Sequence, residues 1–314
     1  MTRAFADRPS IAEANDARRL IDAAAQTPGL VACWTFDEPA GVPRRASAGV
    51  GDFALQEIGG AVPRIDDAPV GGHGVRFDVG SHLQIAHGHT GELNIAGPDA
   101  RVSIFAVVRI DSLDKRGGTI AGMWNEGQGH GDDSGARQYA LLLDMPWYGG
   151  PKRVTPHVSA EGGATRRADG SMLPWCADYA ATPDPYPVGR WCSMGMTYDG
   201  LHIHAFLDGQ AKPWDLDPIE HRRDDRYFTR EAPGGGDRGM NPYHHGRGIF
   251  RYDPARHAAT KVSGGSPFVV GAREVRGRAG SEPLAGDLAA LAVFNTSLTP
   301  TEMLALHRAA LAPS

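Results

Sequence analysis

The sequence predicts an all-β fold, an antiparallel sandwich of two sheets with a short helix at each end of the chain. Of the 314 residues, 41 are Gly and 23 are Pro, so about a fifth of the chain disfavours helix. Apolar and polar residues alternate in many short runs separated by Gly, Pro, Asp and Asn, which is the pattern of strands. Because almost no helical pattern lies between these runs, antiparallel strands are favoured over parallel βαβ units.

The alternating runs predict about a dozen strands. In the segment MTYDGLHIHAFLDG, Asp199-Gly200 separates two such runs, which is a strong hairpin signal. The clearest predicted strands cover residues 30–36, 74–79, 82–86, 102–110, 119–124, 138–144, 154–160, 191–199, 201–209, 267–272 and 286–295.

Helix signals occur near both ends of the chain. Ser10 and Glu13 form a capping box ahead of apolar residues at near-helical spacing, and Pro28-Gly29 ends that pattern. Near the other end, Thr299 is a predicted N-cap, followed by Pro300 at the first helical position. We therefore expect one short helix before the strands and one after them.

The domain organisation follows from these signals. Residues 1–28 are predicted to be an N-terminal helical extension, and residues 29–314 one sandwich domain. Two segments exceed what a minimal sandwich needs, at 125–190 and 210–266. Long loops in a compact domain are often functional. We expect these insertions to wall a pocket.

Charge and composition exclude several classes of partner. The net charge is −5, which gives no overall basic surface for binding nucleic acid. No stretch approaches the roughly 18 apolar residues that cross a bilayer. The N-terminal segment has no apolar run like that of a signal peptide, so we expect a cytoplasmic location, or secretion if a signal has been removed. The sequence does not indicate an oligomeric state.

Five segments together resemble the laminin-G-like, concanavalin-A-like jelly-roll family, and the resemblance spans residues 30–311. It implies a jelly-roll sandwich of two antiparallel sheets, whose concave face binds or cuts carbohydrate in many members. Since one fold hosts many functions, the site needs its own argument. The segments are LVACWTFDEPAG, VRFDVGSHLQIA, VSIFAVVRID, GRWCSMGMTYDGLHIHAFLDG and LAGDLAALAVFNTSLTPTEMLAL.

Candidate site residues lie mainly in the two insertions. On neighbouring strands, Arg137 could pair with a substrate carboxylate, Tyr139 or Tyr243 could donate a proton, and His157 could act as a base. This set is similar to the one that jelly-roll polysaccharide lyases use, without their full motifs. The residues expected to contact a ligand are Trp124, Asn125, Glu126, Gln138, Trp147, Asn241 and His244.

Three functions stay open at this point. The first is recognition of a short glycan or a chain end in a concave pocket. The second is β-elimination on a uronate-containing sugar by the residues above. The third is a protein-interaction module without a glycan. A retaining hydrolase of the usual design is disfavoured, because no Glu-x-Asp-x-Glu run supplies two carboxylates on one strand face.

One metal site is expected. The resemblance implies a structural Ca²⁺ between Asp37 or Glu38 near the first strand and Asp287 on the last long strand. His202 and His204 share one strand face, but a solvent-facing row of the sheet explains them better than zinc, which needs a third ligand that the sequence does not place. The adjacent His244 and His245 should point apart on an extended chain, one of them toward the concave face.

Overall fold

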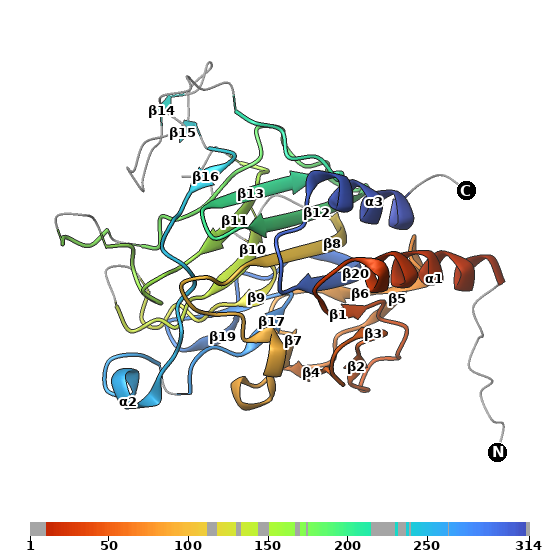
Figure 1. Cartoon of the computed structure of the whole chain (residues 1–314). Coiled ribbons are helices and arrows are strands. Elements are labelled where there is room, and N and C mark those ends of the chain that lie inside the picture. The colour runs from red at the N-terminus through yellow and green to blue at the C-terminus, as the bar shows by residue number, and fades with distance from the viewer. Residues whose placement is uncertain are drawn as a thin grey trace.

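Two antiparallel sheets pack face to face (Figure 1). The computed structural model describes residues 11–111, 118–129, 133–143, 151–166, 170–173, 175–214, 230–231, 237–238, 240–262 and 264–311. All eleven strands named above lie within a residue or two of observed strands, so the predicted two-sheet sandwich is confirmed.

The first sheet has nine strands, with β20 at its centre. β6 (Gly72–Phe77) pairs with the start of β20, and β5 (Arg64–Ala68) pairs with β6. The other strands, in spatial order, are β16 (Tyr243–His244), β13 (His202–Leu207), β12 (Trp191–Tyr198), β8 (Val102–Ile110), β20 (Gly286–Phe294), β1 (Leu30–Trp34) and β3 (Ala48–Gly49).

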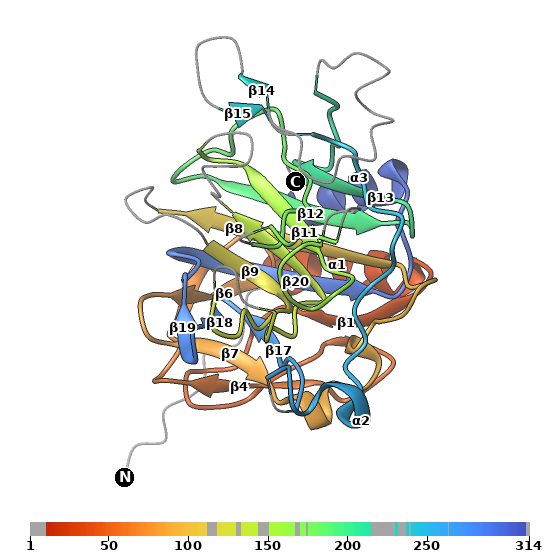
Figure 2. The same cartoon turned by 90° about the vertical axis from the view of Figure 1, so that its left-hand side faces the viewer.

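The second sheet has seven strands, and Figure 2 looks onto it. Two short ribbons lie outside both sheets, β14–β15 (Arg230–Glu231 and Asp237–Arg238) and β18–β19 (Arg273–Val275 and Arg278–Ser281). The strands of the second sheet, in spatial order, are β11 (Val154–Val158), β10 (Tyr139–Leu143), β9 (Gly118–Met123), β17 (Phe268–Val270), β7 (His82–Ile85), β4 (Ala54–Ile58) and β2 (Arg44–Arg45).

The main hydrophobic core fills the space between the sheets. Trp34 of β1 stacks on Phe268 of β17, with ring centroids 5.8 Å apart, and so joins the two layers. Alternate residues of the long strands, such as β8 and β12, enter this core, as a period of two requires. Each fully buried Leu, Ile, Val or Phe contributes about 1.5–3 kcal/mol relative to an exposed one.

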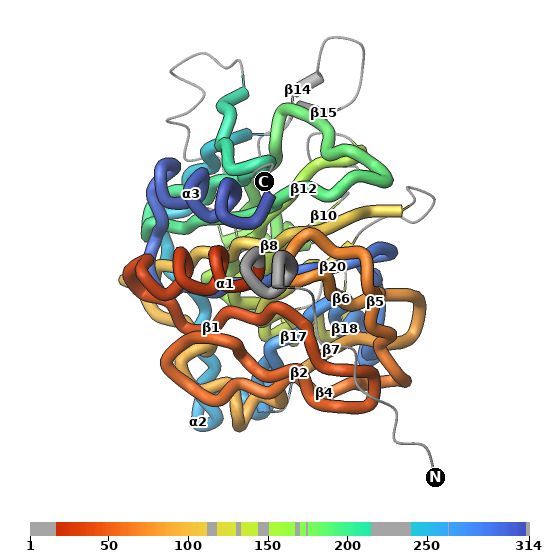
Figure 3. Tube along the Cα trace, turned by 90° about the vertical axis from the view of Figure 1, so that its right-hand side faces the viewer, coloured from red at the N-terminus to blue at the C-terminus, as the bar shows by residue number. Residues whose placement is uncertain are grey.

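Two helices cover the outer face of the first sheet, α1 (Ile11–Gln26) and α3 (Pro300–Leu311) (Figure 3). Leu20 of α1 and Leu306 of α3 belong to one buried cluster with residues of β8 and β20. The predicted N-cap Thr299 is confirmed, and it exchanges hydrogen bonds with Glu302 through side chain and backbone, as in a capping box. The capping box predicted at Ser10 and Glu13 lies outside the described side chains. The two helices α1 and α3 therefore bury this face of the sheet.

The two predicted insertions contain regular structure. The second insertion contributes β16 and the short α-helical turn α2 (Pro254–His257), and the first contributes β10 and β11. Two 3₁₀ turns, η1 (His87–His89) and η2 (Gly91–Leu93), follow β7. The insertions thus extend the two sheets and do not only form loops.

Gly271, just after β17, is the position where we expect a small substitution to disturb the fold. Its φ is +86°, a conformation that favours glycine, and an added Cβ would overlap the ring of Phe77. We expect Gly271→Ala to lower the free energy of unfolding by about 2 kcal/mol or more, from strain and overpacking together. Urea unfolding measures this, and Gly200→Ala, where a Cβ meets nothing, controls for positive φ alone.

Candidate functional site

The outer face of β9, β10 and β11 carries the polar residues of the candidate site. Ala140 of β10 lies opposite Gly122 of β9 and His157 of β11, so His157 shares this outer face. Tyr139, one residue earlier, belongs to the core between the sheets, and its hydroxyl donates to the Leu93 carbonyl at 2.6 Å. Burial raises its pKa. The expectation that Tyr139 shares a face with His157 is therefore corrected.

Glu126 is the carboxylate at the centre of this face. Its Oε1 accepts from Arg273 Nε at 3.0 Å and from Trp124 Nε1 at 3.2 Å. Arg137 Nη2 lies 3.9 Å from its Oε2. Burial alone would raise the pKa of Glu126, but Arg273 and Arg137 outweigh it and hold the pKa below its usual value. The carboxylate is therefore ionised at neutral pH.

Arg273 was not found from the sequence. It is buried, and besides Glu126 it contacts Thr119 Oγ1 from Nη1 at 2.9 Å and the carboxylate of Glu282 from Nη2. It begins β18, a strand too short and too polar to give a periodic signal. Its role is to compensate two carboxylates on one face of the sheet.

Arg137 has a buried nitrogen that lacks a hydrogen-bond acceptor among the described residues. Its side chain is only 3% exposed, and Nη2 donates to the Glu126 carbonyl at 3.1 Å. Nη1 is buried and has no hydrogen-bond partner among the described residues. An unsatisfied buried donor costs about 1–3 kcal/mol, and more when it is charged.

His157 is neutral and oriented. Its Nδ1 lies 2.8 Å from the Thr155 carbonyl, which only accepts, so Nδ1 carries the proton. Burial lowers the pKa of His157 to about 4. Its ring stacks on Tyr179 at 5.4 Å and meets the edge of Trp124 at 5.7 Å, and Tyr179 in turn stacks on Tyr243 at 5.8 Å.

Asp178 anchors the other half of the site. Its carboxylate accepts from Thr165 at 2.8 Å, from Tyr243 at 3.4 Å and from Arg247, and His245 Nδ1 lies 3.3 Å away. Burial would raise the pKa of Asp178, but His245, Arg247 and Thr165 together lower it to about 2. A buried carboxylate that keeps its charge in this way holds four side chains in place.

Arg247 links Asp178 to Glu161, which lies nearer the surface. One nitrogen of its guanidinium contacts each carboxylate. Burial raises the pKa of Glu161, against the opposing effect of Arg247. The environments of Asp178 and Glu161 thus separate the pKa values of two carboxyl groups that share one arginine. No spacing in the sequence pointed to these three residues.

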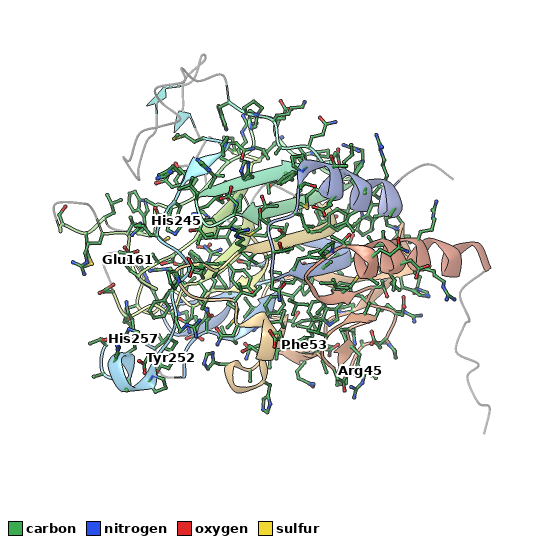
Figure 4. The ribbon with its side chains drawn as sticks, viewed as in Figure 1. Arg45, Phe53, Glu161, His245, Tyr252 and His257 are labelled. Carbon is green, nitrogen blue, oxygen red and sulfur yellow. The ribbon has the colours of Figure 1, made fainter. Side chains whose placement is uncertain are left out.

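The two halves meet at the segment after β11. The Arg137 amide donates to the Gly162 carbonyl at 2.8 Å, next to Glu161, and the Ser159 amide donates to the Gln138 carbonyl at 2.8 Å. Figure 4 shows Glu161 and His245 at the end of the molecule away from α1 and α3. We call the joined set the outer-face cluster, which consists of Trp124, Glu126, Arg137, His157, Glu161, Asp178, Tyr179, Tyr243, His245, Arg247 and Arg273.

The cluster reaches solvent through three of its members. The side chains of Glu126, Glu161 and Arg247 are 17%, 24% and 17% exposed. Taken as whole residues, Trp124, Arg137 and His157 are each at most 2% exposed. The charged groups of Glu126, Glu161 and Arg247 are therefore the part of the cluster that faces solvent.

Other predicted ligand residues serve the structure. Asn125 Oδ1 accepts from the Gly127 amide at 2.9 Å, and Gln138 Nε2 donates to Asn94 Oδ1 at 2.9 Å. Asn241 exchanges two hydrogen bonds with the Ala205 backbone. Trp147 lies outside the described residues.

His244 and His245 lie apart, as expected for neighbours on an extended chain. His245 is buried beside Asp178, whereas His244 is partly exposed and its ring lies 5.5 Å from that of His202. His245, and not the predicted ligand residue His244, therefore belongs to the outer-face cluster.

The three carboxylates expected to hold calcium do not fit that ion. The two oxygens of Asp287 accept from Arg76 Nη1 at 3.1 Å and from Arg109 Nε at 2.8 Å, and these cations would repel another. Asp37 Oδ2 accepts from Thr35, and Glu38 Oε1 from the Arg45 amide. Within the described residues, no three His, Cys, Asp or Glu side chains are arranged to hold a metal ion.

A hollow of about 350 Å³ lies beside η2, at the edge of the sandwich. Asn94, the partner of Gln138, lines it together with Glu92 and Arg101. A second hollow of about 250 Å³ lies between the segment at Thr182 and the end of β13. Neither is lined by the outer-face cluster.

Sequence comparison with known proteins assigns this chain to no family. No family model matches the chain, and no curated protein does. In the part of the chain that the structure describes, no helix is long and apolar enough to cross a membrane.

Several solved structures are similar at low identity. Domain 4 of AbnA, a GH43 extracellular arabinanase from Geobacillus stearothermophilus in complex with arabinotriose, is 13% identical with a TM-score of 0.48, over 89% of this chain and 98% of that one. Trypanosoma rangeli sialidase with the inhibitor DANA is 14% identical with a TM-score of 0.47, over 94% of this chain and 37% of that one. The CBM40 of Ruminococcus gnavus IT-sialidase, bound to α2,3 sialyllactose, is 12% identical with a TM-score of 0.44, over 74% and 96%. Likenesses at this level assign neither a family nor an activity.

Proposed function

We propose that the protein recognises a short glycan, or the end of a glycan chain, at the outer-face cluster. The observation that carries this is Arg137 Nη1, a buried cationic donor without a partner among the described residues, beside an ionised Glu126. Sugars present hydroxyl groups that accept from arginine and donate to carboxylates. Aromatic rings such as Trp124 and Tyr179 offer apolar faces for the C–H side of a pyranose ring.

A second candidate is β-elimination on a uronate-containing sugar, and one observation favours it. His157 is neutral at pH 7, and its Nδ1 donates to the Thr155 carbonyl, so the basic nitrogen in this tautomer is Nε2. In this mechanism Arg137 holds the uronate carboxylate and Nε2 removes the adjacent ring proton. Tyr243, which keeps its proton because burial raises its pKa, protonates the leaving oxygen. Both predicted tyrosines belong to the core cluster, but Tyr243 also stacks on Tyr179 and contacts Asp178, so it is the acid kept in this mechanism.

The test is a titration of the full chain against neutral and uronate-containing oligosaccharides, with turnover followed by the ultraviolet absorbance of the unsaturated product. Arg137→Ala should weaken binding by about 10- to 100-fold, the value of a hydrogen bond to a charged group. Arg18→Ala, on the exposed side of α1, is the matched control and should bind as the unaltered protein does.

The outcomes separate the candidates. Binding without turnover supports glycan recognition, whereas turnover that disappears in His157→Ala supports the lyase. If Arg137→Ala binds every glycan as tightly as Arg18→Ala, the outer-face cluster is not the site. Absence of binding and turnover would favour a protein-interaction module.

A further inference from the structure

Three imidazoles gather on the first sheet, away from the outer-face cluster. His202 and His204 lie two residues apart on β13, and His244 of β16 is the register partner of His202. The ring of His202 lies 5.5 Å from that of His244 and 6.3 Å from that of His204, measured between centroids. The third histidine that the sequence did not place therefore comes from the neighbouring strand.

All three rings face outward from the sheet. Ile203 and Ala205, which alternate with them on β13, enter the core between the sheets. Phe206, on the outer side, packs in the cluster beneath α1 and α3, and the three histidines are partly exposed. They are thus accessible to a small ion from solvent.

Asp199 is the carboxylate beside the central ring of the group. His202 Nδ1 lies 3.9 Å from Asp199 Oδ2, which is beyond hydrogen-bond distance, and Asp199 Oδ1 accepts from the backbone amides of Leu201 and His202. A histidine that binds a metal commonly directs its other ring nitrogen to a carboxylate, which fixes the tautomer and strengthens the ligand. Asp199 is the carboxylate that would take this part when an ion holds the ring.

The ring separations match those of a shared ion. With metal–nitrogen bonds of about 2.0–2.1 Å, two imidazoles on one ion have centroids on the order of 5–6 Å apart. His202 and His244 meet this separation as placed, whereas the ring of His204, 6.3 Å from that of His202, would have to move closer. As placed, the three form no complete three-ligand set, so the site begins from the pair.

We propose that His202 and His244 bind a divalent transition-metal ion of the zinc class between β13 and β16, with His204 as the third ligand. Imidazole ligands suit Zn²⁺ and Cu²⁺ over Ca²⁺ or Mg²⁺. The ion ties the edge strand β16, and the segment that carries His245 and Arg247, to the rest of the sheet.

The test is calorimetric titration of the full chain with ZnCl₂ at about pH 7.5, where an ordinary imidazole is neutral. We expect one saturable equivalent of zinc, lost in His202→Ala and in His244→Ala. Asp199→Asn should bind about 10- to 100-fold more weakly, as expected for loss of an orienting carboxylate. His89→Ala, which removes an exposed histidine of η1, is the control and should bind like the unaltered protein.

A second readout uses the unaltered protein. Substoichiometric Cu²⁺ should broaden the imidazole proton resonances of His202 and His244 before those of the other histidines. The proposal is overturned if the protein takes up no zinc, if His202→Ala and His244→Ala bind it as the control does, or if broadening begins elsewhere. Circular dichroism of each variant without metal shows that lost binding is not lost folding, and His202→Asn replaces an alanine variant that does not fold.

Discussion

Asp178→Asn should lower the free energy of unfolding by about 3–5 kcal/mol, the usual effect of removing one partner from a buried ion pair. The neutral amide leaves the partly buried Arg247 and the buried His245 without the charge that now compensates them. It also puts an NH₂ group where Asp178 accepts from Thr165 or Tyr243. Urea unfolding followed by tryptophan fluorescence measures the change.

The matched control is Asp52→Asn, which breaks an ion pair with Arg45 at the surface. The side chains of Arg45 and Asp52 are both more than half exposed, and such surface ion pairs contribute about 0–1 kcal/mol to the free energy of unfolding. If Asp178→Asn and Asp52→Asn unfold at the same urea concentration, Asp178 is not the anchor described above. A loss confined to Asp178→Asn supports the network around it.

His157 predicts a specific pH dependence of stability. Its folded pKa of about 4 lies below the value of 6.5 expected in the unfolded chain, so the unfolded state binds more protons between these values. Stability is therefore complete above about pH 6.5 and falls as pH decreases toward 4. The expected loss is about 3 kcal/mol, at 1.36 kcal/mol per pH unit of difference.

The effect of Asp178 falls in another range. Its pKa is lowered, so the stability it contributes is present above the unfolded value near 3.8 and is lost as pH falls toward 2.

Urea unfolding of the unaltered protein and of His157→Gln from pH 7 to about pH 4 isolates the effect of the histidine. The difference between the two should shrink as pH falls, whereas His89→Gln should follow the unaltered protein throughout. Parallel curves for the unaltered protein and His157→Gln would contradict a neutral, buried His157.

The strands were predictable where both periodicity and turn residues are strong. β8 and β20 are long runs of β-branched and apolar residues between polar turns, and the start of α3 has its capping box. β4 and β5 were missed, because ALQEI and RIDDA carry charges and lie half-exposed near a sheet edge. In these two strands the tertiary neighbours, and not local preference, determine the structure.

The candidate site was predictable only in part. Trp124, Glu126, Arg137 and His157 gather as expected, since neighbouring strands bring them to one face. Tyr139 was misplaced because a shift of one residue moves a side chain to the other face of a sheet.

The residues that the sequence did not reveal reach the site over long separations. Arg273 contacts Glu126 across 147 residues of sequence, and Arg247 contacts Asp178 across 69. No local sequence pattern predicts contacts between residues so far apart in the chain. Whether any of these residues contacts a ligand is what the binding and turnover experiments test.

The position of β20 has a consequence for how the chain acquires its structure during synthesis. β20, at residues 286–294, pairs with β8, β1 and β6, and no strand links β1 and β3 to β8 without it. The first sheet therefore stays in separate pieces until almost the whole chain has left the ribosome. Contacts of such high sequence separation fold slowly and leave apolar strand edges exposed. A nascent chain that stalls before residue 286 should depend on chaperones to avoid aggregation.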